Sequence, residues 1–167
     1  DSAPGAAFSG TAVERRRTRL IFLSTALGAF LVTANVSTMN VAFPDLEASF
    51  TETSRGALTW VLNAYTISFA ALLIPAGRLA DRFGRRPLFM AGLTVFSLSS
   101  FLVGAAPSFP IVVVARVAQG VGGALIIPAS LGLLLAGTPE AARMSTVAKW
   151  GALTALGVAT GPAAGAL

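Results

Sequence analysis

Long apolar stretches constrain the fold of this 167-residue chain more than any other sequence feature. A helix needs about 20 mostly apolar residues to cross roughly 30 Å of hydrocarbon, and five stretches reach or approach that length. Because a backbone inside a bilayer must satisfy its own hydrogen bonds, we expect these stretches to be α-helices. The predicted helices cover about residues 20–43, 57–80, 88–105, 110–136 and 145–167.

The predicted fold class is therefore an all-α, polytopic membrane protein, and the composition agrees with it. Hydrophobic residues make up 54% of the chain and charged residues 11%, whereas a soluble domain has roughly a quarter charged residues. This balance excludes a water-soluble globule, a disordered segment and a nucleic-acid-binding module. The chain contains no Cys and no His, so we expect no zinc or haem site, no other cofactor and no enzymatic activity.

The Lys and Arg residues are distributed unevenly between the two sides of the predicted helices. Ten of the 12 precede the first helix, join the second to the third, or begin the fifth, whereas the opposite loops contain only Arg55. The positive-inside rule then places the N-terminus in the cytoplasm. We expect a multi-pass protein of the cell (inner) membrane, with a flexible basic tail over residues 1–18. The chain begins with Asp1 and stops within an apolar stretch, so we expect it to be part of a longer protein.

Polar side chains within the predicted spans are costly there and are therefore functional candidates. Arg116 lies six residues into the fourth span, ~9 Å deep, and Asn35 lies ~12 Å below the end of the first span. Gln119 follows Arg116 by about one turn and extends a polar stripe on the same face. We expect Asn35 and Arg116 to face one cavity if their helices are neighbours; the alternative is that Arg116 extends outward to the interface. Other polar candidates, which alternatively only join helices, are Asn40, Asn63 and Tyr65.

The sequence contains two glycine-containing motifs, one in a predicted cytoplasmic turn and one within the predicted fifth helix. The first is Gly77-Arg78-Leu79-Ala80-Asp81-Arg82-Phe83-Gly84-Arg85-Arg86, between the second and third helices. Glycine and Arg are general features of a short cytoplasmic turn, but Asp81 is not, and it precedes Arg85 by four residues, close enough to pair. In the second motif Gly157, Gly161 and Gly165 recur every four residues, which permits close helix contact, and Pro162 is expected to kink the helix.

Together these motifs resemble the signatures of the major facilitator superfamily. The loop matches that family's pattern G-x-L-A-D-R-x-G-R-R, and Arg116-Val117-Ala118-Gln119-Gly120 resembles its fourth-helix pattern R-x-x-Q-G. The glycines of the fifth helix resemble the antiporter signature, with Ala166 in place of its final glycine. Asn40-Val41-Ala42-Phe43-Pro44 resembles the end of the first helix in the fourteen-helix drug:proton antiporter group.

The resemblance implies a proton-driven exporter of drugs or other small amphipathic molecules that works by alternating access. Its halves are built from inverted three-helix repeats, so the first and fourth helices would be repeat equivalents. Residues 19–167 would be an incomplete N-terminal domain of a transporter with twelve or fourteen helices. Its partners would be the lipid bilayer, a small-molecule substrate, protons and the remaining C-terminal helices.

The resemblance also implies roles for the motif residues. Asn35, Asn63, Arg116 and Gln119 would lie on the transport path or take part in proton coupling. The loop motif would close the cytoplasmic side against the second half, and the Gly161-Pro162 pair would bend the fifth helix where the halves meet. The loop residues concerned are Gly77, Asp81, Arg82, Gly84, Arg85 and Arg86.

One residue departs from the pattern. Asn35 stands where the drug:proton antiporter group usually has Asp, and an amide does not titrate. Coupling would then use a carboxylate elsewhere in the full-length protein, or would differ from that of the group. Two other functions stay open: a metabolite transporter of the same superfamily, or a transport-silent sensor or assembly subunit on the same scaffold.

Overall fold

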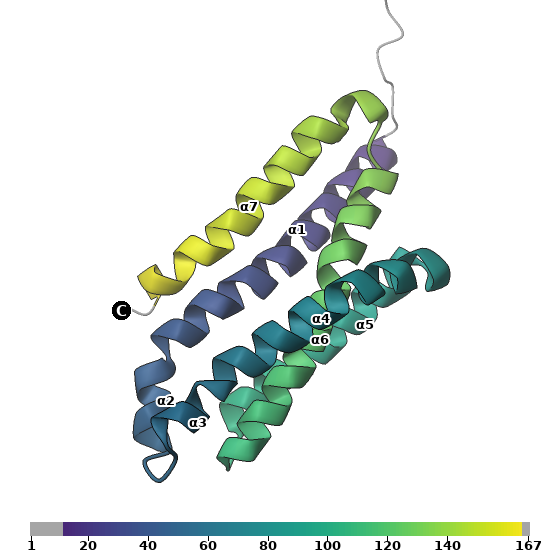
Figure 1. Ribbon diagram of the computed structural model, residues 1–167. Helices are drawn as coiled ribbons and strands as arrows, with labels where there is room; N and C mark the ends of the chain where they lie inside the picture. The colour runs from purple at the N-terminus through teal and green to yellow at the C-terminus, as the bar shows by residue number, and fades with distance from the viewer. Residues whose placement is uncertain (1–11, 165–167) are drawn as a thin grey trace, which may run out of the picture.

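The computed structural model describes residues 12–164, and within that range the chain is helical apart from short connections. Figure 1 shows the helices as long rods, which confirms the all-α prediction. The elements, in chain order, are α1 (Ala12–Val41), α2 (Phe43–Ser49), α3 (Arg55–Leu58), α4 (Trp60–Phe83), α5 (Arg85–Ala105), α6 (Phe109–Ala136), η1 (Glu140–Ala142) and α7 (Arg143–Ala164).

Four of the described helical segments are long and apolar enough to cross a membrane. They correspond to the first four predicted spans, with ends that differ by a few residues. The predicted fifth span corresponds to α7, a 22-residue helix that is not among these four. Its glycines and threonines, together with Lys149, make α7 less apolar than the others. The four segments are Arg16–Val41, Arg55–Phe83, Arg85–Ala105 and Phe109–Ala136.

The first helix and the loop after it differ from the prediction. The helix α1 begins at Ala12, so residues 12–18, expected in a flexible tail, are helical. These residues include Ala, Glu and Arg, which are good helix formers and extend the helix beyond its apolar part. Pro44, which directly follows the predicted first helix at residues 20–43, lies in the first turn of α2, where a missing backbone N–H carries no penalty.

The long helices pack as two groups, which are joined mainly by α1 and α6. One group is the pair α1 and α7, which lie side by side along most of their length, and the other consists of α4, α5 and α6 (Figure 1). The packing of α1 on α6 joins the two groups. At this junction the buried side chains of Val32, Tyr65, Phe89 and Ile126 belong to one apolar cluster.

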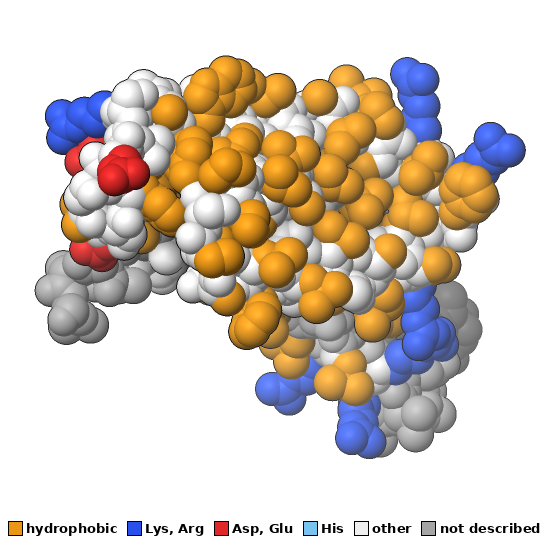
Figure 2. All heavy atoms as spheres, turned by 90° about the horizontal axis from the view of Figure 1, so that it is seen from below, with side chains coloured by type: hydrophobic (Ala, Val, Ile, Leu, Met, Phe, Trp, Pro, Cys, Tyr) orange, Lys and Arg blue, Asp and Glu red, His pale blue; other side chains and the backbone are white. Residues whose placement is uncertain are grey.

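In the face shown in Figure 2, the exposed charged side chains lie toward the two ends of the bundle, and the surface between them is largely apolar. One end, which we call the acidic end, contains α2, α3 and the pair between Glu47 and Arg55. The guanidinium of Arg55 donates hydrogen bonds of 2.7 and 3.2 Å to the Glu47 carboxylate and thereby lowers the pKa of Glu47. The other end, which we call the basic end, contains the start of α1, the α4–α5 turn and the start of α7. This separation of charge follows the distribution expected from the sequence.

Candidate functional site

Arg116 of α6 is buried in a polar cluster between the helices, with only 1% of its surface exposed. Its Nε donates a hydrogen bond to the Val61 carbonyl oxygen at 2.9 Å. Its Nη1 donates to Asn35 Oδ1 and to Gln119 Oε1, both at 2.6 Å. The guanidinium carbon lies 4.4 Å from the centre of the Tyr65 ring, a favourable position for a cation. The buried guanidinium therefore joins α1, α4 and α6.

Gln119 extends this cluster to a fourth helix. It is also 1% exposed, and its Nε2 donates a 2.5 Å hydrogen bond to Ser100 Oγ of α5. Tyr65 donates its hydroxyl hydrogen to the Val32 carbonyl oxygen at 3.2 Å and so ties α4 to α1. We refer to Arg116, Gln119, Asn35, Tyr65 and Ser100 as the Arg116 cluster.

The sequence of α6 explains why this cluster can form. Arg116 and Gln119 are three residues apart and therefore lie on one helix face. Directly after them Gly120 allows close approach, because a Cβ atom there would lie 2.6 Å from the Tyr65 carbonyl oxygen. Since α4 comes this near, the backbone of Val61 and the ring of Tyr65 reach the guanidinium.

The structure brings most of the predicted polar residues together, but not all of them. Asn35, Arg116 and Gln119 are in contact, as the depths of Asn35 and Arg116 indicated. Asn63 is exposed and outside the cluster, because two residues correspond to about 200° around a helix and place it away from the face of Tyr65. Asn40 is also exposed, and its Nδ2 donates to the Val36 carbonyl oxygen of its own helix.

All partners of Arg116 in the described structure are neutral. Among the side chains of residues 16–160, ion pairs join only Arg55 to Glu47 and Arg85 to Asp81. A buried cation usually has an anionic partner, because carbonyl and amide oxygens compensate its lost hydration less fully. A carboxylate at the position of Asn35 would contact the guanidinium directly, since Asn35 Oδ1 lies 2.6 Å from Arg116 Nη1.

Replacing Asn35 with Asp is therefore expected to stabilise the full-length protein by about 1 kcal/mol, because a charge-assisted hydrogen bond replaces a neutral one next to an unpaired cation. Thermal unfolding of the purified protein measures this effect. Asn40→Asp is the matched control, since Asn40 is exposed on the same helix. A stability gain that is equal in both variants, or absent from Asn35→Asp, would contradict the prediction.

The motif at the α4–α5 turn is held by Arg85. Gly84 ends α4 with a φ of 97°, a conformation that favours glycine. Arg85 Nη1 then donates a 2.7 Å hydrogen bond to the Gly132 carbonyl oxygen of α6. Its Nη2 lies 3.2 Å from Asp81 Oδ1, which is the pair expected from their spacing. Arg85 thus connects the turn to α6.

The other residues of this motif have fewer contacts. Gly77 faces α6 at Pro128, where a Cβ atom on the glycine would lie 3.8 Å from the proline Cβ. The Arg82 guanidinium carbon lies 5.4 Å from the centre of the Phe83 ring. Arg82 and Arg86 are exposed at the basic end, and their side chains are free to meet another part of the protein or the membrane surface.

We expect Arg85→Ala to destabilise the full-length protein by about 1 kcal/mol through loss of the bond to α6. Asp81→Asn removes only an ion pair whose side chains are 41% and 70% exposed, so we expect a loss below ~0.5 kcal/mol. Denaturant unfolding of both variants gives the comparison. The prediction fails if Asp81→Asn is the more destabilising of the two.

Close contact between α7 and α1 is built around Gly157. A Cβ atom at this glycine would lie 2.7 Å from the Phe30 carbonyl oxygen. Next to it, two hydroxyls of α1 donate to carbonyl oxygens of α7: Thr33 to Thr154 at 2.8 Å and Ser37 to Val158 at 2.5 Å. The helix α7 continues through Gly161 and Pro162, whereas Gly165 of the same motif lies outside the described residues.

Comparison with known proteins identifies the family of the chain. A family model described as Major Facilitator Superfamily matches residues 25–167. The chain belongs to the Major Facilitator Superfamily. This superfamily match covers all of the Arg116 cluster, the α4–α5 turn and α7.

Relatives within the superfamily have names connected with drug resistance. The chain is 38% identical over 153 residues to the multidrug resistance protein Stp of Mycobacterium tuberculosis, covering 90% of this chain and 28% of that protein. It is 37% identical over 143 residues to the methylenomycin A resistance protein of Bacillus subtilis, covering 85% of this chain and 30% of that protein. It is 33% identical over 167 residues to the tetracenomycin C resistance and export protein of Streptomyces glaucescens, covering 100% of this chain and 31% of that protein. The chain thus spans less than a third of the length of these relatives.

The packing of this superfamily member also fits the expected equivalence of α1 and α6. Two of the extensive helix contacts involve these helices: α4 lies on α6, and α7 lies on α1. An inverted repeat that relates α1 to α6 would also relate α4 to α7. The two closest contacts, at Gly120 and Gly157, occupy corresponding pairs of helices.

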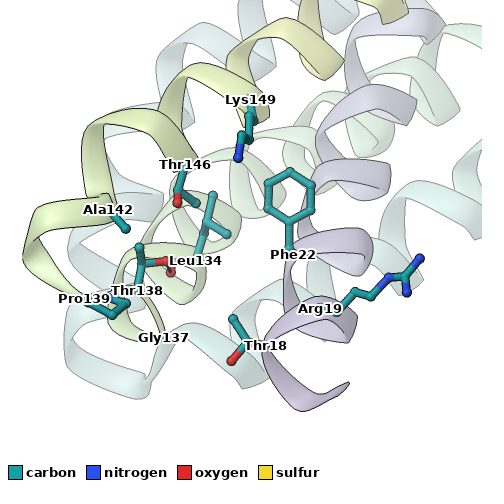
Figure 3. Close-up of a pocket in the computed structure, with 10 residues that line it drawn as sticks. All are labelled: Thr18, Arg19, Phe22, Leu134, Gly137, Thr138, Pro139, Ala142, Thr146 and Lys149. Carbon is teal, nitrogen blue, oxygen red and sulfur yellow. Dashed lines mark hydrogen bonds between the residues drawn. The ribbon is translucent and has the colours of Figure 1, made fainter. Parts of the chain in front are cut away.

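A cavity of about 570 Å³ opens at the basic end, between α1, the end of α6 and the start of α7. Figure 3 shows Phe22 and Thr146 on its walls, with the Lys149 amine extending toward the same space and Arg19 pointing away from it. The walls carry cations and no carboxylate. The cavity lies far from Arg116 along the bundle and is not part of the Arg116 cluster.

Three residues that contribute to the Arg116 cluster or the α4–α5 turn were missed from the sequence. Ser100 lies five residues before the end of α5, ~8 Å deep, so the depth argument that joined Asn35 to Arg116 would also have found it. Gly132 contributes only a backbone oxygen, for which no side-chain pattern exists. Val61 contributes in the same way.

Proposed function

We propose that the full-length protein is a proton-coupled transporter that exports drugs or other small amphipathic molecules by alternating access. The Arg116 cluster is the observation that carries this proposal. It places a buried cation in a polar cluster that involves four helices, in a superfamily whose members move substrates between two halves. The drug resistance and export named for three relatives supports the choice of substrate class.

We propose that Arg116, Gln119 and Asn35 take part in transport through this cluster, and that Asn63 faces the transport path from the exposed side of α4. A cluster with neutral acceptors holds no titrating carboxylate of its own. The proton-carrying carboxylate is therefore proposed to lie outside residues 12–164, in helices that complete the transporter. An enzymatic role is not proposed.

We propose that the protein lies in the cell (inner) membrane with its basic end facing the cytoplasm. The cations at the start of α1, at the α4–α5 turn and at the start of α7 support this orientation through the positive-inside rule. The turn held by Arg85 is then proposed to close the cytoplasmic side, and the segment around Gly161 and Pro162 to contact the second half.

Inverted membrane vesicles that contain the full-length protein provide the test. We expect the vesicles to take up a drug-like dye such as Nile red when their interior is made more acidic than the medium. We expect this uptake to be lost when a protonophore removes the gradient. Uptake without proton dependence would leave an exporter with another coupling ion. Absence of both dye uptake and dye-stimulated proton flux, at normal protein abundance, would favour a sensor or assembly subunit instead.

A further inference from the structure

A second cavity, of about 430 Å³, lies between α1, α4, α6 and α7. Three aromatic side chains line it, Tyr65, Phe69 and Trp150, together with aliphatic residues and threonines. The rings of Tyr65 and Phe69 are stacked, 6.0 Å apart and inclined by 11°. Such walls suit a flat aromatic molecule.

The hydroxyl groups of this cavity are occupied within the protein. Thr33 donates to the Thr154 carbonyl oxygen at 2.8 Å, and Thr66 donates to Leu62 at 3.0 Å. Thr154 donates to the Trp150 carbonyl oxygen at 2.8 Å. Tyr65 donates to Val32, as described above. These hydroxyls can accept a hydrogen bond from a ligand, but none has a hydrogen left to donate without breaking a bond.

The indole N–H of Trp150, unlike these hydroxyls, has no acceptor within the described structure. Its Nε1 is buried without a hydrogen-bond acceptor, and it is the one such side-chain atom found among the described residues. A buried donor without a partner costs free energy comparable to a lost hydrogen bond, and such groups need a physical reason. No bond fixes the orientation of the indole, so a change of its side-chain torsions that gave the N–H an acceptor would lower the free energy.

We propose that Trp150 determines ligand specificity in this cavity by turning to donate its N–H to an acceptor oxygen of a neutral, planar aromatic ligand. The proposal rests on the proposed transport function, because it names the substrate class of that function. No charged side chain lines the cavity. The cation of Arg116 lies 4.4 Å from the centre of the Tyr65 ring, which lines the cavity, and has no anionic partner among the described residues, so an organic cation is disfavoured.

Equilibrium binding of two fluorescent dyes to the full-length protein in lipid nanodiscs tests this proposal. Nile red is neutral and planar and has a ring carbonyl, whereas N-phenyl-1-naphthylamine is neutral and aromatic without a carbonyl. Trp150→Phe keeps an aromatic ring and removes the donor. We expect it to weaken Nile red binding about tenfold and naphthylamine binding less than twofold, as loss of one hydrogen bond predicts.

Two further measurements separate recognition from a structural role. Without a ligand, Trp150→Phe is expected not to lower the melting temperature, because the lost donor has no acceptor in the described structure. Trp60→Phe is the matched control, since Trp60 is 54% exposed on α4, and it should leave both dyes unaffected.

Several results would overturn the proposal. One is that Trp150→Phe weakens the binding of both dyes equally and lowers the melting temperature. Another is that Trp150→Phe leaves the affinity for Nile red unchanged. The third is that the unmodified protein does not bind Nile red. The proposed function fails separately. If the binding pattern is as expected but vesicles do not take up Nile red, the recognition site stands and transport of this ligand does not.

Discussion

Arg116→Ala in the full-length protein is expected to abolish proton-driven uptake of Nile red into inverted vesicles. The substitution removes the donor to Val61, Asn35 and Gln119 at once. Each buried acceptor left without a partner costs about 1–3 kcal/mol. The helices α1, α4 and α6 also lose the group that joins them, so the arrangement on which alternating access depends is no longer defined.

Arg116→Lys separates the charge of this residue from its geometry. Lysine keeps the positive charge, but its ammonium is a compact group on a flexible stem and cannot reproduce the planar fork that reaches three acceptors. We therefore expect uptake to fall at least tenfold in this variant as well. Recovery of normal uptake in Arg116→Lys would show that charge alone is required.

The control for both variants is Arg55→Ala, which removes an exposed arginine paired with Glu47 at the acidic end. It should leave uptake within a factor of two, because exposed ion pairs contribute little. Protein abundance in the vesicles is measured in parallel, so that loss of folding is not mistaken for loss of transport. Unchanged uptake in Arg116→Ala at equal abundance would remove Arg116 from the mechanism.

Gly122→Ala is expected to have a large effect on folding. A Cβ atom at Gly122 would lie 2.7 Å from the Phe96 backbone nitrogen and 3.0 Å from the Gly92 carbonyl oxygen. These are backbone atoms of α5, which no side-chain rotation can move. The two helices must separate, and overpacking of this kind costs about 3 kcal/mol or more. We expect a much lower melting temperature and little protein in the membrane.

Gly104→Ala provides the comparison for that substitution. Gly104 also lies in a membrane-spanning helix, α5, but a Cβ atom there would meet nothing within 4 Å. Alanine has the higher helix propensity, so this variant should be at least as stable as the unmodified protein. Similar melting temperatures for the two variants would be incompatible with the close contact between α5 and α6.

The sequence was sufficient to predict the helices and one long-range contact. The apolar stretches located the helices, because a bilayer requires about the same length from each of them. Depth matched Asn35 to Arg116, since both residues are measured from the same membrane surface, but their contact was predicted only on the condition that their helices are neighbours. In the loop motif, the four-residue spacing of Asp81 and Arg85 predicted their pair.

The partners of each helix were not predictable in the same way. Membrane helices are apolar on nearly all sides, so no stripe of hydrophobic residues marks the face that packs. The pairing of α1 with α7 depends on Gly157 meeting the backbone of Phe30 and on hydroxyls that bind carbonyl oxygens. Such contacts involve backbone atoms, which carry no sequence pattern. The contribution of Gly132 to the α4–α5 turn was missed for the same reason.

The neutral surroundings of Arg116 have an electrical consequence. A guanidinium remains charged at neutral pH, and its partners in the described structure do not cancel that charge. The membrane potential therefore acts on α6 directly. Moving one elementary charge across the whole potential corresponds to about 2.3 kcal/mol per 100 mV, and smaller displacements to a proportional share. Any step that shifts Arg116 along the membrane normal would be sensitive to voltage as well as to the proton gradient.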